Sequence, residues 1–188
     1  RQLANKSVGI CAPRRFNEAA EHKKSAEARQ GAMELYSALA SEIGQAAEPY
    51  LINMMPAVLA NHGDKSNHVR AAAEAALAVA RDMFLTRPVC ATPLLVPLFE
   101  GLKMGKWQSK VAALQIMGRL VPAAPIQIAH AMSDLIPALT EAIWDTKAEV
   151  AAAAVDVLTK CVNSVDNRDL TPFIPALLKA LQDPKEVS

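Results

Sequence analysis

The feature that most constrains the fold of this chain is a proline that returns at a nearly constant spacing. Four prolines stand 41, 40 and 38 residues apart, at Pro56, Pro97, Pro137 and Pro175. Each lies in a similar apolar phrase, which reads Leu-Ile-Pro-Ala-Leu around Pro137 and Ile-Pro-Ala-Leu-Leu around Pro175. Self-similarity at a period near 40 residues indicates an array of repeated supersecondary units. Such units bury their apolar faces by stacking, so we expect an elongated molecule.

A second pattern follows each of the first three prolines. A valine stands 13 or 14 residues later and opens an alanine-rich segment, at Val69, Val111 and Val150. In the segment from Val69 the apolar residues recur at i, i+3, i+4 and i+7, which is one face of an α-helix. A short polar turn precedes each segment, and its Ser, Asn, Asp or Thr side chains can accept hydrogen bonds from the free amides of the following helix. Each unit is therefore predicted to be helix, tight turn, helix.

These patterns predict an all-α fold, a right-handed α-solenoid of about four to five HEAT-type helix pairs. The chain 1–188 is then a single array, with units at about 14–44, 49–86, 92–121, 126–163 and 168–188. Helices are expected over 23–43, 49–61, 68–86, 92–103, 107–121, 126–143, 148–163 and 168–182. The internal proline should bend the first helix of each unit, because it removes a backbone hydrogen bond.

The last unit lacks its second helix in this sequence. We therefore expect the chain to be a fragment of a longer protein, whose remainder packs on the apolar face of the helix over 168–182. That face carries Ile174, Leu178 and Leu181.

Composition narrows the classes of function. Hydrophobic residues make up 52% of the chain and aromatic residues 4%, which favours close packing of small helical side chains over a β-sandwich. The net charge of +1 supplies no global attraction to nucleic acid or anionic membranes, so any such affinity needs a local patch. No apolar run is long enough to span a bilayer, and we expect a cytoplasmic protein without a membrane partner.

The cysteines do not signal a disulfide framework. Cys11, Cys90 and Cys161 are far apart and none belongs to a C-x-x-C pair, so a reducing compartment is expected. Cys161 falls on the apolar face of its helix and is interpreted as a small core residue.

No catalytic or metal-binding motif is found. The stretch from Gly101 to Trp107 resembles a phosphate loop only faintly, because its glycines are too close and Trp107 stands where a magnesium-binding Ser or Thr is needed. His62, Asp64 and His68 lack the spacing of metal ligands. We expect no enzyme activity, metal, cofactor or small-molecule substrate in this chain.

Basic residues are the functional signal. Lys103, Lys106 and Lys110 crowd one inter-helix turn beside Trp107. Such a cluster can hold RNA phosphates, although lysine and arginine also simply solvate helix ends. Packing is the favoured interpretation of Trp107 and Trp144. The remaining candidate contacts are Arg70, as a weaker one, and Arg14 and Arg15 in a second cluster near the start of the chain.

Several phrases resemble one known family. WQSKVAAL at Trp107–Leu114, WDTKAEV at Trp144–Val150 and VDNRDL at Val165–Leu170 are similar to the HEAT region of translation elongation factor 3. The similarity continues through Phe173–Leu177 and Asp183–Val187. It spans about 107–187, and its register extends back to about residue 20.

The resemblance implies a ribosome-docking module. Members of that family are cytoplasmic ATPases that bind the ribosome and promote release of deacylated tRNA from the exit site. Their ATP and magnesium sites lie in two downstream ABC cassettes, which this chain lacks. The implied partners are ribosomal RNA and ribosomal proteins. The alternative is a HEAT-repeat protein scaffold, such as the related ribosome-associated coactivator of the starvation-response kinase or a transport-receptor-type module.

Overall fold

The computed structural model describes residues 13–86 and 91–164, together with Pro175 and Leu178. Regular structure in these segments is helical, which confirms the all-α fold. Residues 13–20 form a first short helix. The helices that follow are α2 (Ala26–Glu42), the 3₁₀ helix η1 (Gly44–Ala47), α3 (Glu48–His62), α4 (Asn67–Thr86), α5 (Ala91–Leu102), α6 (Trp107–Ala123), α7 (Pro125–His130), α8 (Met132–Ile143) and α9 (Ala148–Ser164).

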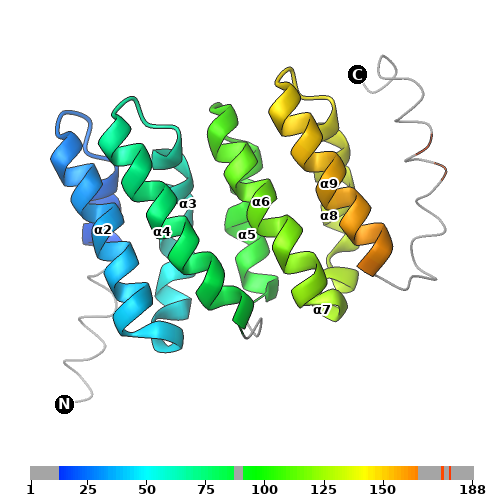
Figure 1. Cartoon of the computed structure of the whole chain (residues 1–188), viewed down its shortest axis with the longest axis horizontal. Helices are drawn as coiled ribbons and strands as arrows, with labels where there is room; N and C mark the ends of the chain where they lie inside the picture. The colour runs from blue at the N-terminus through cyan, green and yellow to red at the C-terminus, as the bar shows by residue number, and fades with distance from the viewer. Residues whose placement is uncertain (1–12, 87–90, 165–174, 176–177, 179–188) are drawn as a thin grey trace.

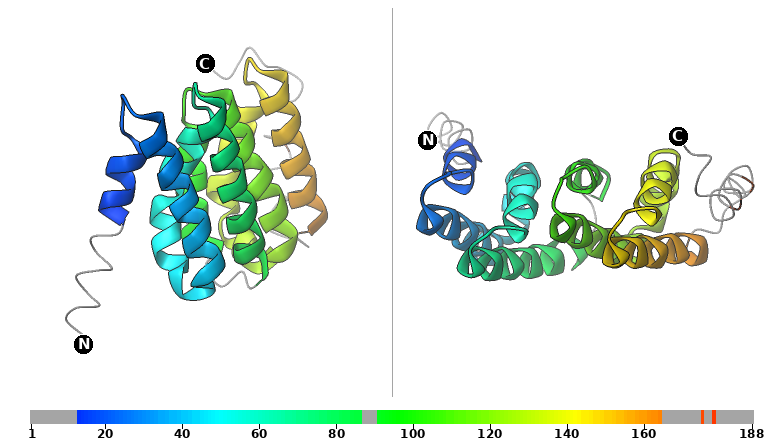
Figure 2. Two further views of the ribbon diagram at one scale, coloured as in Figure 1. Left: turned by 60° about the vertical axis from the view of Figure 1, so that its left-hand side comes forward. Right: turned by 90° about the horizontal axis from the view of Figure 1, so that it is seen from above.

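The helices are arranged as an α-solenoid, as expected. Figure 1 and the view from above in Figure 2 show two layers, with α3, α5 and α8 in one layer and α2, α4, α6 and α9 in the other. Within each unit the first helix packs on the second, as α3 does on α4, α5 on α6 and α8 on α9. None of the described helices is both long enough and apolar enough to cross a bilayer.

The core lies between the two layers and runs the length of the array. The proline-bearing helices supply large side chains such as Leu51, Met55 and Leu98, while the second helices supply small ones such as Ala73 and Ala113. Small residues allow helix axes to approach closely, and the methionines and leucines fill the space that remains. Cys161 is fully buried, as expected, and this burial raises the pKa of its thiol to about 11.

Helix α2 begins later than the expected range of 23–43. Ser25 has an extended backbone, and its hydroxyl accepts a hydrogen bond from the amide of Ala28 at 3.1 Å, so it caps the helix. Serine is among the preferred residues for this position, because its oxygen satisfies one of the amides that the first turn leaves free. Lys23 and Lys24 therefore lie in the turn and not in the helix.

The expected single helix over 126–143 is wrong. Ala131 interrupts it with a backbone ψ of 2°, and its amide bonds to the carbonyl of Ile128, so the chain makes a tight turn between α7 and α8. The turn allows Ile128 and Met132 to reach the core from two different helices. The expected helix over 168–182 lies outside the described residues, as do Cys11, Cys90, Ile174 and Leu181. Leu178 is 52% exposed.

Two glycines provide a matched test of the packing. A Cβ at Gly101 in α5 would lie 2.9 Å from both the Cβ of Ala113 and the Cδ1 of Leu59. Gly101→Ala should therefore lower the free energy of unfolding by about 1–3 kcal/mol, through overpacking. Gly31 in α2 has nothing within 4 Å of such a Cβ, and Gly31→Ala should raise that free energy by about 0.5–1 kcal/mol. Urea unfolding measures both, and a Gly101→Ala protein as stable as the parent would contradict this packing.

Candidate nucleic-acid interface

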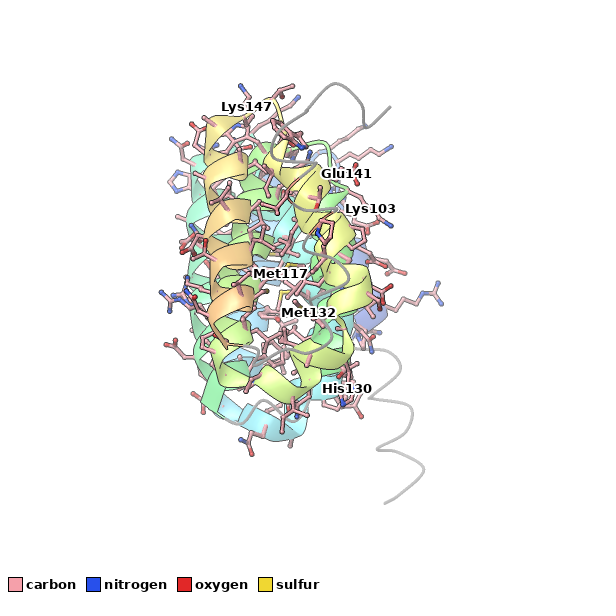
Figure 3. The ribbon with its side chains drawn as sticks, turned by 90° about the vertical axis from the view of Figure 1, so that its right-hand side faces the viewer. Lys103, Met117, His130, Met132, Glu141 and Lys147 are labelled. Atoms are coloured by element: carbon pink, nitrogen blue, oxygen red, sulfur yellow. The ribbon has the colours of Figure 1, made fainter. Side chains whose placement is uncertain are left out.

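The turns that join the two helices of each unit lie along one edge of the solenoid. In the described part of the chain these turns are 21–25, 63–66, 103–106 and 144–147, and Figure 1 shows them at the top of the molecule. We call this surface the turn edge. Its exposed lysines are Lys23, Lys24, Lys65, Lys103, Lys106 and Lys147. Figure 3 shows Lys103 and Lys147 toward this end of the helices and His130 at the opposite end.

Two aspartates of the turn edge are neutralised by the unit before them. The guanidinium of Arg29 donates to both carboxylate oxygens of Asp64, at 2.9 and 3.0 Å. The ammonium of Lys110 donates to Asp145 at 2.5 Å. Both pairs join residues 35 apart in the sequence, and all four side chains are no more than 25% exposed. Each pair is therefore an ionic strap between consecutive units, contributed by the second helix of the earlier unit.

The straps hold both aspartates in the ionised form. The hydrogen bond from Lys110 is the main reason that the pKa of Asp145 is lowered, and the amide of Lys147 assists it. Burial by itself would raise the pKa of Asp64, but the hydrogen bonds from Arg29 and from the amide of Ser66 outweigh it and lower the pKa. The charge of Lys106 also contributes to the lowered pKa of Asp64, but none of the turn-edge lysines forms an ion pair with a described residue.

The junction between α4 and α6 lacks a strap. Arg70 is the fourth residue of α4, as Arg29 is of α2 and Lys110 is of α6. The position of the missing acid is occupied by Met104, and Arg70 instead donates to the carbonyl oxygens of Asp64 and Lys65, at 2.8 and 3.1 Å. Helix α4 also contacts α6 far less than α2 contacts α4 or α6 contacts α9. The turn over 103–106 consequently contains no strapped aspartate, and the charge of its Lys106 acts on Asp64 of the preceding unit, whose pKa it helps to lower.

The structure separates the candidate lysines of this turn. Lys103 and Lys106 are exposed, and neither makes an ion pair with another described residue. The stem of Lys106 lies against Gly63, since a Cβ there would be 2.6 Å from the Cδ of Lys106. Lys110 is instead held by Asp145. The cluster of three lysines is thus two outward charges and one structural strap.

The other candidates lie apart from this turn. Arg14 and Arg15 are exposed at the start of the helix over 13–20, and Arg14 pairs with Glu18 at 2.9 Å on the surface. Sequence reasoning did not select Lys65 and Lys147 as candidates. The signal for them was available, because every expected turn contains a lysine and the turns of a solenoid stack along one edge.

Packing was the wrong expectation for both tryptophans. Trp107 is 36% exposed and Trp144 is 38% exposed. Trp107 is the first residue of α6 and directly follows Lys106 in the chain, so an exposed aromatic residue and an exposed lysine share this turn. Among the described residues, no group of three or more His, Cys, Asp or Glu side chains could hold a metal ion.

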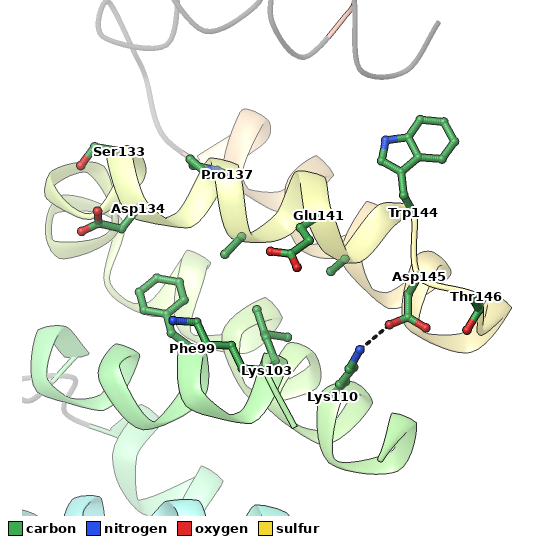
Figure 4. A pocket seen from close by; sticks show the side chains of 13 residues that line it. Phe99, Lys103, Lys110, Ser133, Asp134, Pro137, Glu141, Trp144, Asp145 and Thr146 are labelled. Carbon is green, nitrogen blue, oxygen red and sulfur yellow. Dashed lines mark hydrogen bonds and ion pairs between the residues drawn. The ribbon is translucent and has the colours of Figure 1, made fainter. Parts of the chain in front are cut away.

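A groove of about 700 Å³ lies between α5 and α8, next to the turn edge. Figure 4 shows Phe99 and Lys103 rising from α5 toward Asp134 and Glu141, which come from α8. The Lys110–Asp145 strap borders the groove at the end near the turns. The remaining lining residues are Leu102, Ser133, Pro137, Ala138, Ala142, Trp144 and Thr146.

Comparison with known proteins agrees with this architecture. The family described as "EF3 N-terminal HEAT repeat" matches residues 5–158. The chain belongs to this family. The match begins further upstream than the motifs in the sequence suggested, and it includes Arg14 and Arg15.

Curated relatives are translation elongation factors. The chain is 36% identical to elongation factor 3A of Saccharomyces cerevisiae over 176 residues, which is 92% of the chain and 17% of the yeast protein. It is 39% identical to elongation factor 3 of Zygosaccharomyces rouxii over 175 residues, and 36% identical to elongation factor 3 of Phytophthora infestans over 186 residues. The aligned part of this chain spans 17% of the length of each of these relatives. The chain is therefore similar to a minor part of these elongation factors, and the family match assigns that part to their N-terminal HEAT repeats.

The straps should make stability depend on pH. Asp145→Asn removes the carboxylate that Lys110 holds, and we expect it to lower the free energy of unfolding at neutral pH by about 2 kcal/mol. Because the pKa of Asp145 is lowered by folding, the strap contributes fully above the ordinary aspartate pKa of about 4 and is lost as the pH falls through the folded value. The difference between parent and variant should therefore shrink below about pH 3.

Urea unfolding at neutral and acidic pH measures this difference. Asp156→Asn is the control, because Asp156 pairs with Lys160 in an exposed bridge, which contributes at most about 1 kcal/mol. If Asp145→Asn lowered the free energy of unfolding no more than Asp156→Asn does, the strap would not support the fold.

Proposed function

We propose that this chain docks an elongation factor 3-type protein on the ribosome during translation elongation, in the cytoplasm. The chain itself is non-catalytic in this proposal. ATP and magnesium belong to ABC domains outside it, and the longer protein uses them in releasing tRNA from the exit site. The observation that carries the proposal is the turn edge, where the two aspartates are strapped and the lysines are left unpaired.

Ribosomal RNA is the partner that such an edge would recognise, because its backbone carries phosphates. Lysine ammonium groups neutralise phosphates and release condensed counterions, so each contact adds to affinity and to its salt dependence. A net charge of +1 provides no long-range attraction, and local density of lysines has to supply it. In this chain that density is found where the turns stack, at Lys65, Lys103, Lys106 and Lys147.

Trp107 adds a second kind of contact. Trp107 is 36% exposed and follows Lys106 in the chain, and an unpaired base can stack on an exposed aromatic ring while its phosphate meets a nearby ammonium group. Arg70, Arg14 and Arg15 are secondary contacts in this proposal, because Arg70 is committed to backbone carbonyls and Arg14 to Glu18.

Charge reversal tests the proposed interface. Lys103→Glu and Lys106→Glu should each weaken co-sedimentation with purified yeast ribosomes by about tenfold at low salt. Each variant should also reduce the slope of log affinity against log salt by about one. Lys110→Glu is unsuitable for this test, because it would break the strap to Asp145.

Arg119→Glu is the matched control. Arg119 is exposed on α6, away from the turn edge, and its reversal changes the net charge by the same amount. If Arg119→Glu weakened ribosome binding as much as Lys106→Glu, only the overall charge would matter. That result would contradict docking through the turn edge. Binding that hardly responds to salt would favour the alternative, a protein scaffold.

A further inference from the structure

We propose that the groove between α5 and α8 binds an extended protein segment that carries arginine or lysine side chains. This site lies beside the proposed RNA-binding edge and takes a different class of partner. The groove shares Lys103, Trp144, Asp145 and Thr146 with the turn edge, but the proposal rests on Asp134 and Glu141 of α8, which lie outside that edge.

The wall formed by α8 presents negative charge that nothing in the described chain neutralises. Asp134 and Glu141 both line the groove and both are exposed, and neither makes an ion pair or a side-chain hydrogen bond with another described residue. Figure 4 shows both side chains on the side of α8 that faces α5. They stand seven positions apart on one helix, which is about 10 Å along its axis.

The proline of the repeat adds an acceptor to the same wall. Pro137 has no amide hydrogen, so the carbonyl of Ser133, four residues earlier, has no helical donor. Ser133 and Pro137 both line the groove, so the freed carbonyl belongs to its α8 wall, whereas the hydroxyl of Ser133 points away from α5. The α8 wall therefore offers two carboxylates and a carbonyl oxygen. A guanidinium or ammonium group matches this set, because it carries several donors and no acceptor.

The floor of the groove suits the stems of such side chains. Phe99, Leu102, Pro137, Ala138 and Ala142 supply apolar contact between the polar groups. Long basic side chains bury their methylene groups against surfaces of this kind while the charged end meets an acceptor. Trp144 borders one end of the groove, but its indole points away from α5 and is not part of the proposed binding surface.

Charge excludes the other classes of occupant. A phosphate backbone or an acidic peptide would meet two unpaired carboxylates along the α8 wall, and like charges at close range oppose binding. Lys110 does not offset them, because Asp145 already holds it. Lys103, on the α5 wall, is one free cation, and it suits the carbonyl oxygens of an extended backbone. The separation of about 10 Å between the carboxylates equals roughly three residues of an extended polyproline II segment, whose three-residue turn places residues i and i+3 on the same face.

Peptide binding tests this inference. The probe is a fluorescent, capped alanine peptide with two arginines three residues apart, titrated onto the whole chain at low salt. We expect the double variant Asp134→Asn with Glu141→Gln to weaken binding about fivefold to tenfold, because it removes the charge with little change in shape. The control is Glu149→Gln with Asp156→Asn, which removes the same charge from α9 outside the groove and should leave binding unchanged. Circular dichroism checks that both proteins are folded.

Three results would overturn the proposal. They are no binding of the peptide to the parent chain, equal weakening in the two double variants, or retention of the affinity when both arginines are replaced by glutamate. A groove that instead holds RNA would be revealed by an oligouridine whose affinity rises in the Asp134→Asn, Glu141→Gln protein and not in its control. Ribosome binding by Lys106→Glu is a separate readout, because Lys106 does not line the groove.

Discussion

No helix pair in this chain can bury its apolar face alone, and the rest of the structure depends on this constraint. Each unit offers one face to the unit before it and one to the unit after it, so the core is continuous along the solenoid. Alanine-rich second helices allow close approach, and Gly101 shows how close, since a single methyl group there would meet α3 and α6. The same stacking brings the turns that join the two helices of each unit to one edge.

The ionic straps decide what that edge presents to a partner. Arg29 and Lys110 each reach forward to an aspartate of the next unit, which places both aspartates in largely buried positions. The lysines of the turns are not needed for this purpose and remain exposed. At the junction of α4 and α6 the acid is replaced by Met104, and the turn beside it carries the lysines on which the proposed RNA interface centres. The groove between α5 and α8 begins at the same turn, so opposite charges stand on neighbouring surfaces of two consecutive units.

Much of the fold was predictable because the repeat can be recognised from the spacing of residues that are close in the sequence. The observed bounds of α3, α4, α5, α6 and α9 differ from the expected ranges by two residues or fewer. The break at Ala131 was not predictable, since no glycine or proline marks it in the sequence and the residues on either side, Ile128 and Met132, are both apolar and buried. Among the candidate contacts, the lysine cluster was visible in the sequence. That Lys110 is held by an aspartate 35 residues away was not, because the register between units sets this contact.

The sequence by itself determined the period, the helix pairs, the family and the position of a lysine in every described turn. These properties follow from the spacing of residues along the sequence, which does not depend on how one unit packs against the next. Tertiary structure alone decided which charges face outward, that Trp107 and Trp144 are partly exposed, and that Asp134 and Glu141 line a groove. The physical reason is that exposure and pairing depend on how one unit is placed against the next, and that placement is set by packing across the junction.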